Sequence, residues 1–165
     1  MIVFSIRPKH DVKLLTLLLE LVKQSTHFNI KELIMSNFSF SKRSLNNLVG
    51  VNEDLVKVVH RALELSEIDF TVVEGVRTKE RQVELVNQGK SKTMNSYHIP
   101  NSNGGRAVDL YPFYEGKVQV NAPHSQWSKI AKAMKAAANE LGITITWGGD
   151  WKTFVDAPHY QIEGK

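Results

Sequence analysis

The chain has 165 residues, 42% of them hydrophobic, which is enough to bury the core of one domain. It contains no cysteine, so disulfides, thiol catalysis and zinc sites with cysteine ligands are excluded, and any metal must be bound through nitrogen and oxygen. The net charge of +4 suits nucleic acid, anionic lipid or bacterial cell wall, but no block of basic residues or nucleic-acid signature is present, so we expect no nucleic-acid partner.

The N-terminal region contains one apolar stretch, Leu14–Val22. Glu20 interrupts it and no small-residue cleavage site follows, so we do not interpret it as a signal peptide. A membrane-spanning helix needs about twenty apolar residues, and we therefore expect no stable membrane insertion. We interpret residues 1–34 as an N-terminal extension and residues 35–165 as a single domain.

Two helices and a strand are predicted in the first part of this domain. Residues 52–66 have apolar side chains at three- and four-residue spacing after an asparagine N-cap, which predicts a helix. Residues 70–74 are rich in β-branched side chains and predict a strand that ends at a glycine. A second helix is predicted between a threonine cap at 78 and the glycine at 89.

The second part of the domain begins with a long polar loop, residues 90–105, of a length that is usually functional or disordered. The expected elements that follow are a strand at 106–111 ended by Pro112, a short hairpin return at 117–120, a helix at 125–141, a strand at 143–147, a turn at 148–151 and a strand at 158–162. Because no regular βαβ units occur, we predict an α+β fold in which helices pack on one side of a small, mainly antiparallel sheet.

Two of the six histidines, His98 and His159, lie beside predicted strands, each with an aspartate nearby. Asp109 lies inside an apolar strand, where a carboxylate without a partner is costly. Two histidines and one carboxylate can bind a catalytic metal, although non-haem iron oxygenases use the same set. Asp156, three residues before His159, favours hydrolysis, because hydrolysis needs a base beside the attacking water and an oxygenase does not. The other histidines fall in the extension or on helices, where surface roles are expected.

Several ordered motifs between Phe38 and Gln161 together resemble a known family. They are Ser41-Lys42-Arg43-Ser44-Leu45, Gly75-Val76-Arg77-Thr78, Asn95-Ser96-Tyr97-His98, Ala107-Val108-Asp109-Leu110, and Trp147-Gly148-Gly149-Asp150-Trp151-Lys152-Thr153-Phe154 with Asp156-Ala157-Pro158-His159. This region resembles the zinc peptidases of the D-alanyl-D-alanine carboxypeptidase type, in particular the phage L-alanyl-D-glutamate endopeptidases, or endolysins. The resemblance implies a hedgehog/D-Ala-D-Ala peptidase-like fold.

The resemblance also implies roles for individual residues. His98, Asp109 and His159 would bind Zn²⁺, and Asp156 would be the general base and acid. Arg77 would be catalytic, by stabilising the oxyanion, or would bind a substrate carboxylate; a surface salt bridge is the structural alternative.

Two further residues are assigned to substrate binding, Ser96 on the same basis and Trp151 without support from the resemblance. Ser96 would line the pocket, and Trp151 would line a groove for the peptide stem, with turn packing as the alternative role of this tryptophan. One departure from the family pattern is the segment Ile99–Gly105, which looks like a loop insertion because the family places its first histidine and aspartate ligands closer together. We keep the ligand assignment, since loops tolerate lengthening at modest cost. The family's base is often glutamate, and an aspartate at 156 matches the phage endopeptidase branch.

The functional hypothesis is therefore a zinc-dependent peptidoglycan hydrolase that cleaves the L-Ala–D-Glu bond of the stem peptide as a phage or prophage endolysin. Such an enzyme would be an antimicrobial monomer that stays in the host cytoplasm before lysis, needs a holin-type pore, and acts at the periplasmic cell wall. The alternatives are a D-alanyl-D-alanine carboxypeptidase, a non-catalytic cell-wall-binding module and a basic nucleic-acid protein.

Overall fold

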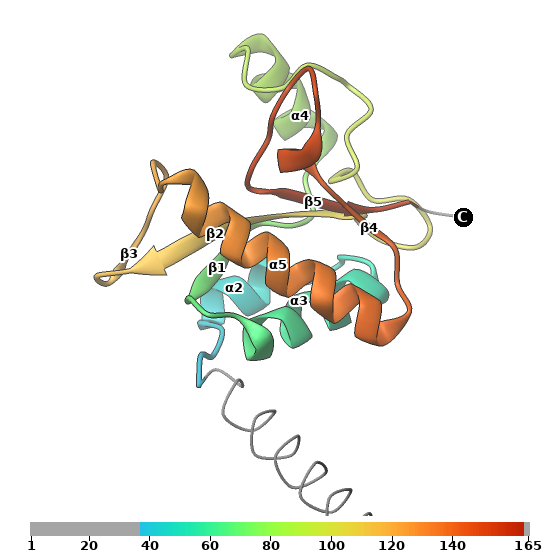
Figure 1. Ribbon diagram of the computed structural model, residues 1–165. Coiled ribbons are helices and arrows are strands. Elements are labelled where there is room, and N and C mark those ends of the chain that lie inside the picture. The colour runs from blue at the N-terminus through green and yellow to red at the C-terminus, as the bar shows by residue number, and fades with distance from the viewer. Residues whose placement is uncertain (1–36, 164–165) are drawn as a thin grey trace, which may run out of the picture. The chain divides into compact units, whose positions relative to one another are not determined.

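The computed structural model describes residues 37–163, all within one of the two units into which the chain divides, Ser36–Lys165 (Figure 1). The extension predicted for residues 1–34 lies outside the described residues, so its boundary stays a prediction. Between residues 37 and 163, no helix combines the length and hydropathy that crossing a membrane requires.

A five-stranded antiparallel sheet forms the centre of the fold. Its main path runs in the order β1 (Phe70–Glu74), β2 (Ala107–Tyr114), β5 (His159–Ile162) and β4 (Ile145–Trp147), and β3 (Lys117–Val118) pairs with the far end of β2. Every pairing is antiparallel, including those between strands far apart in the sequence. The predicted α+β class with a mainly antiparallel sheet is confirmed.

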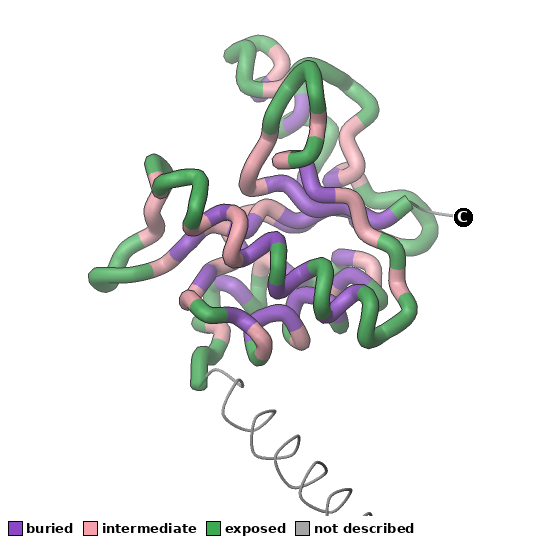
Figure 2. The backbone as a smooth tube through the Cα atoms, in the orientation of Figure 1, coloured by how far each residue is buried: buried purple, intermediate pink, exposed green. Residues whose placement is uncertain are grey.

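Helices α3 (Glu53–Leu65) and α5 (His124–Leu141) pack against each other and cover one face of the sheet (Figure 1). Their apolar stripes meet the side chains that β1 and β2 turn toward them, and Figure 2 shows the buried chain gathered between these helices and the sheet. Helix α4 (Lys79–Asn87) and the loops around it lie beyond the opposite face. One face of the sheet is thus closed by core packing, and the other is left to irregular segments.

The predicted helices begin and end close to the expected residues. The Asn52 side chain accepts a hydrogen bond from the Asp54 amide at 3.0 Å, and the Thr78 hydroxyl accepts one from the Arg81 amide at 3.1 Å. Gly142 ends the longest described helix in the left-handed conformation, with φ of 67°. These boundaries were predictable because capping depends on a few neighbouring residues.

Strand β2 does not end at Pro112, as predicted, but continues to Tyr114. The Pro112 carbonyl accepts a hydrogen bond from the Gln119 amide at 2.9 Å, on the side of β2 away from β1. A residue in a strand directs its N–H and C=O to the same side, so an N–H at position 112 would also point away from β1. Among the described strands none lies there to accept it, because β5 pairs only with Ala107–Asp109. Proline therefore removes no bond to β1 and is tolerated.

Other elements differ from the prediction in length. The hairpin turn before β3 has Glu115 and Gly116 at φ of 54° and 71°, the conformation that two-residue hairpins favour. Strand β4 is shorter than predicted, and the turn that follows forms the short 3₁₀ helix η1 (Gly148–Asp150).

The short helix α2 (Lys42–Asn47) was not predicted. It covers the edge strand β1: the Ser44 hydroxyl lies 2.8 Å from that of Thr71, and the Asn47 amide donates to the carbonyls of Val72 and Val73, both at 2.9 Å. Edge strands need such cover because their free backbone groups otherwise invite pairing with another chain. Part of the first family motif therefore serves the sheet edge.

This edge contact predicts the effect of Asn47→Ala. Because two strand carbonyls lose their donor, the substitution should lower the free energy of unfolding by about 2 kcal/mol. The matched control is Asn46→Ala, one residue earlier in the same helix, whose exposed side chain predicts a change below about 0.5 kcal/mol. Urea unfolding followed by circular dichroism measures both, and equal effects would contradict the role of Asn47.

Candidate metal centre

The register of three neighbouring strands places three polar residues in a row across the open face of the sheet. Asp109 on β2 lies opposite Glu74 on β1 and opposite His159 on β5. Facing residues of antiparallel strands have side chains within about 5 Å of each other. Two of the predicted ligands, fifty residues apart in sequence, are thus brought together by backbone pairing.

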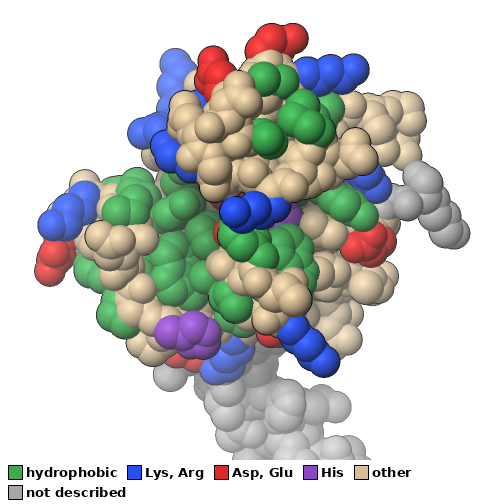
Figure 3. Space-filling model, turned by 90° about the horizontal axis from the view of Figure 1, so that it is seen from above, with side chains coloured by type: hydrophobic (Ala, Val, Ile, Leu, Met, Phe, Trp, Pro, Cys, Tyr) green, Lys and Arg blue, Asp and Glu red, His purple; other side chains and the backbone are tan. Residues whose placement is uncertain are grey.

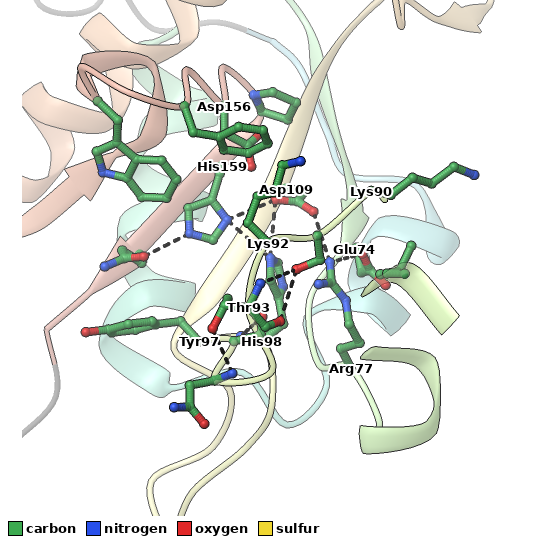
Figure 4. A pocket seen from close by; sticks show the side chains of 18 of the residues that line it. Glu74, Arg77, Lys90, Lys92, Thr93, Tyr97, His98, Asp109, Asp156 and His159 are labelled. Carbon is green, nitrogen blue, oxygen red and sulfur yellow. Dashed lines mark hydrogen bonds and ion pairs between the residues drawn. The ribbon is translucent and has the colours of Figure 1, made fainter. Parts of the chain in front are cut away.

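The loop before β2 supplies His98. Its backbone is tied to the domain on both sides, because the Arg77 amide donates to the His98 carbonyl at 2.9 Å and the Arg106 amide donates to the Tyr97 carbonyl at 2.7 Å. The His98 side chain is only 2% exposed and points into the row of polar residues (Figure 4). His98 therefore completes the predicted set from outside the sheet.

The inserted segment Ile99–Gly105 does not disturb this arrangement. Asn101 and Gly104 bond to each other as a tight turn. Gly105 is held against the start of α3, donating to the Gly50 carbonyl at 2.9 Å and accepting from the Asn52 amide at 2.8 Å. The inserted residues therefore form a turn between His98 and Gly105, both of which are hydrogen-bonded to the rest of the domain.

Three donor atoms converge on one point in this centre. His98 Nε2, His159 Nδ1 and Asp109 Oδ1 are each 3.3 Å from the other two. Zinc is bound at about 2.0–2.1 Å, and tetrahedral geometry then separates any two ligand atoms by about 3.3 Å. The spacing therefore fits a metal with a further position left for water or substrate.

The outer nitrogens of the two histidines define their tautomers. His98 Nδ1 lies 2.7 Å from the Gly75 carbonyl, and His159 Nε2 lies 3.0 Å from Gln161 Oε1, so each outer nitrogen donates its hydrogen. The inner nitrogens are then left with lone pairs that face the Asp109 carboxylate. Three electron-rich atoms this close repel one another unless a cation lies between them, so the donor chemistry fits a metal ion.

The charge of Asp109 is maintained by its neighbours. Burial alone would raise the pKa of this carboxyl. Where a proton on an inner histidine nitrogen takes the place of the metal ion, attraction to His98 and hydrogen bonds from both imidazoles hold the pKa below its ordinary value. Its second oxygen, Oδ2, lies 3.6 Å from Arg77 Nη2. These neighbours favour the charged form of Asp109.

Arg77 is not in a surface salt bridge, because its side chain is only 9% exposed. Its Nη2 pairs with Glu74 as well as Asp109, and its Nη1 donates to Gln82 at 2.8 Å. The guanidinium therefore orients Asp109 from behind and places positive charge in the wall of the site (Figure 4).

Asp156 lines the same pocket from the loop between η1 and β5. Burial raises the pKa of this carboxyl above its ordinary value, and the negative charge of Asp109 adds to the rise. The loop approaches Gly148 so closely that a Cβ there would lie 2.5 Å from the Asp156 carbonyl oxygen and 3.1 Å from the Asp156 Cβ. The Trp147 indole also donates to the Ala157 carbonyl at 2.8 Å, which fixes the loop and gives this tryptophan a packing role.

The pocket around these groups has a volume of about 540 Å³. In the space-filling view a histidine is visible in a recess bordered by a basic side chain (Figure 3). Ser96 and Trp151 both line the pocket; the Ser96 hydroxyl accepts from the His98 amide at 3.3 Å, and the Trp151 ring lies 5.2 Å from the His159 ring. All seven predicted site residues thus border one cavity.

Two residues with clear structural roles were missed in the sequence. Gln161 accepts the His159 hydrogen bond, and its own amide donates to Glu163 at 2.9 Å, which fixes the amide orientation. Its position two residues after His159 on a strand was the available signal, because such residues share a face. Gln82, fully buried at the back of the pocket, gave no signal from its place on an exposed-looking helix.

Comparison with known proteins gives consistent matches. A family model described as phage L-alanyl-D-glutamate peptidase matches residues 35–163. The L-alanyl-D-glutamate peptidase of Escherichia phage T5 is 37% identical over 123 residues, covering 73% of this chain and 86% of that protein. The peptidoglycan L-alanyl-D-glutamate endopeptidase CwlK of Bacillus subtilis is 30% identical over 135 residues, covering 72% and 73%. The crystal structure of the Serratia marcescens L-Ala D-Glu endopeptidase ChiX superposes with a TM-score of 0.69 at 41% identity, covering 78% of this chain and 92% of that one.

The outer hydrogen bond of His159 predicts the effect of Gln161→Leu. Leucine fills similar space but cannot accept the Nε2 hydrogen, so the imidazole loses its orientation and zinc affinity should fall about 10-fold or more. Gln119→Leu, in the hairpin after β3, is the matched control and should leave affinity unchanged. Competition with a chromophoric chelator measures both values, and unchanged affinity in Gln161→Leu would contradict the role of this glutamine.

Proposed function

The chain belongs to the phage L-alanyl-D-glutamate peptidase family, and on that premise we propose that it is a zinc endopeptidase that cuts the bond between L-alanine and D-glutamate in peptidoglycan stem peptides. The observation that carries this proposal is the triangle of His98, Asp109 and His159 donor atoms in a pocket that also contains Asp156. A ligand set with one coordination position left open, next to a carboxyl of raised pKa, is what metal-assisted hydrolysis requires.

The proposed roles follow from the geometry. Zinc, when bound by His98, Asp109 and His159, would supply Lewis-acid polarisation of the scissile carbonyl and activation of water. Asp156 takes the proton from the attacking water and returns it to the nitrogen of the leaving D-glutamate, a reaction for which its raised pKa suits it. Arg77 holds Asp109 in place and supplies positive charge as the oxyanion develops.

The substrate would be held by the walls of the pocket. Ser96 offers a hydroxyl beside His98, and Trp151 offers an aromatic surface beside His159. An aromatic surface of this kind suits the methyl and methylene groups of a stem peptide. We assign both residues to substrate binding.

The proposal extends to the biological setting. Two of its supports are phage origin among the relatives and a net charge of +4, which favours contact with anionic cell wall. The protein would act as a monomeric endolysin with antimicrobial activity, remaining in the host cytoplasm until a holin-type pore gives it access to the periplasmic wall.

The product of digestion distinguishes this function from a D-alanyl-D-alanine carboxypeptidase. Cleavage between L-alanine and D-glutamate leaves L-alanine attached to the glycan and creates a new free amine on D-glutamate. Purified peptidoglycan digested with the zinc-loaded protein should therefore release peptides with N-terminal glutamate, detected by mass spectrometry after amine labelling. Loss of a single terminal alanine, with no new glutamate amine, would contradict the endopeptidase assignment.

Asp156→Asn tests catalysis against simple wall binding. Asparagine keeps the size of the side chain but cannot accept the proton, so kcat should fall about 100-fold or more. Zinc content and wall association should persist, because Asp156 is not part of the donor triangle.

The matched control is Asp150→Asn, six residues earlier, where the carboxylate pairs with Lys135 at the surface. Its turnover should equal that of the unmodified protein. If Asp156→Asn retained full turnover, or if the unmodified protein bound wall without cutting it, the catalytic role would be wrong.

A further inference from the structure

Three positive side chains line the pocket, and they differ in what they bind. Arg77 is committed to Glu74, Asp109 and Gln82. Lys90 and Lys92, by contrast, make no ion pair with any carboxylate among residues 37–163. In the close view Lys92 is drawn over the pocket, whereas Lys90 extends away from it (Figure 4). Of the two pocket lysines without an ion pair among these residues, Lys92 is therefore the one that lies over the pocket.

The backbone on each side of Lys92 is fixed by a buried residue. Gln82, which is fully buried, donates from Nε2 to the Ser91 hydroxyl at 2.8 Å and to the Thr93 carbonyl at 2.6 Å. The same amide accepts from Arg77 through Oε1 at 2.8 Å. One glutamine thus ties both neighbours of Lys92 to the arginine behind the donor triangle, so the lysine is presented from an anchored segment.

The negative groups of the pocket leave room for an anionic ligand. Glu74 and Asp109 are paired with Arg77, and Asp109 also faces the two histidines. A substrate carboxylate that enters the pocket therefore meets Asp156 as the remaining unpaired acid and Lys92 as a cation without an ion pair in the described part of the chain.

The proposed substrate carries a carboxylate of this kind. A glutamate whose amine forms the scissile bond has two carboxyl groups, and only one of them can continue the peptide chain. The other is free and lies within the residue that leaves. We propose that Lys92 binds this free carboxylate of D-glutamate and thereby selects the acid over its amide; this inference rests on the proposed endopeptidase function.

The test compares two muropeptides that differ only at this carboxyl, one with the free acid and one with the carboxamide. Lys92→Met should lower kcat/KM about 10-fold or more on the acid, because an ion-paired hydrogen bond is lost, and less than about 2-fold on the amide. Lys92→Arg should retain most of the activity on the acid. Lys117→Met, an exposed lysine in β3, is the control and should leave both rates unchanged.

The outcomes separate the inference from the function on which it rests. If the unmodified protein cut neither muropeptide between alanine and glutamate, the proposed function would be wrong. If it cut both, and Lys92→Met slowed both equally while zinc content and the melting temperature stayed unchanged, the assignment of Lys92 would be overturned. A loss confined to the acid would support it.

Discussion

The antiparallel register between β2 and β5 is the constraint on which the site depends. Backbone pairing places Asp109 opposite His159. If β5 shifted by one residue along β2, one of the two side chains would turn toward the core. The apolar side chains that β2 and β5 bury in the core enforce this register, because slippage would expose them to water. Core packing on one face of the sheet therefore sets the spacing of these candidate ligands on the other.

Much of the fold could be predicted because its signals are local. Caps such as Asn52 and Thr78 involve only a few neighbouring residues, and the helices they begin were placed correctly. The errors lie where distant segments decide the outcome. Pro112 was expected to end a strand, but β2 continues through it. Because β5 stops before this position, the N–H that proline lacks would have had no partner strand. Helix α2 was missed because six residues show too little periodicity, and its role at the sheet edge depends on β1.

The residues of the candidate site could be predicted from the sequence, but the groups that orient them could not. His98, Asp109, His159 and Asp156 were identified from residue type, spacing and family resemblance, and the structure brings all four to one pocket. The groups that orient the ligands carry no such signal. The Gly75 carbonyl that fixes the His98 tautomer belongs to the backbone, so its role cannot be predicted from the type of residue at position 75. The pairing of Glu74 with Arg77 shows in the same way how cross-strand neighbours surround a metal ligand with partners.

The turn at Asn101–Gly104 has a consequence for how this chain can change. Its two ends are attached to the domain separately, His98 through the Arg77 amide and Gly105 through Gly50 and Asn52. Because both ends are held in this way, a change in the number of residues between them need not move His98 or Asp109. The same property makes this turn a suitable place for grafting: a peptide or a small wall-binding module joined there would be carried beside the catalytic pocket while the sheet kept its register.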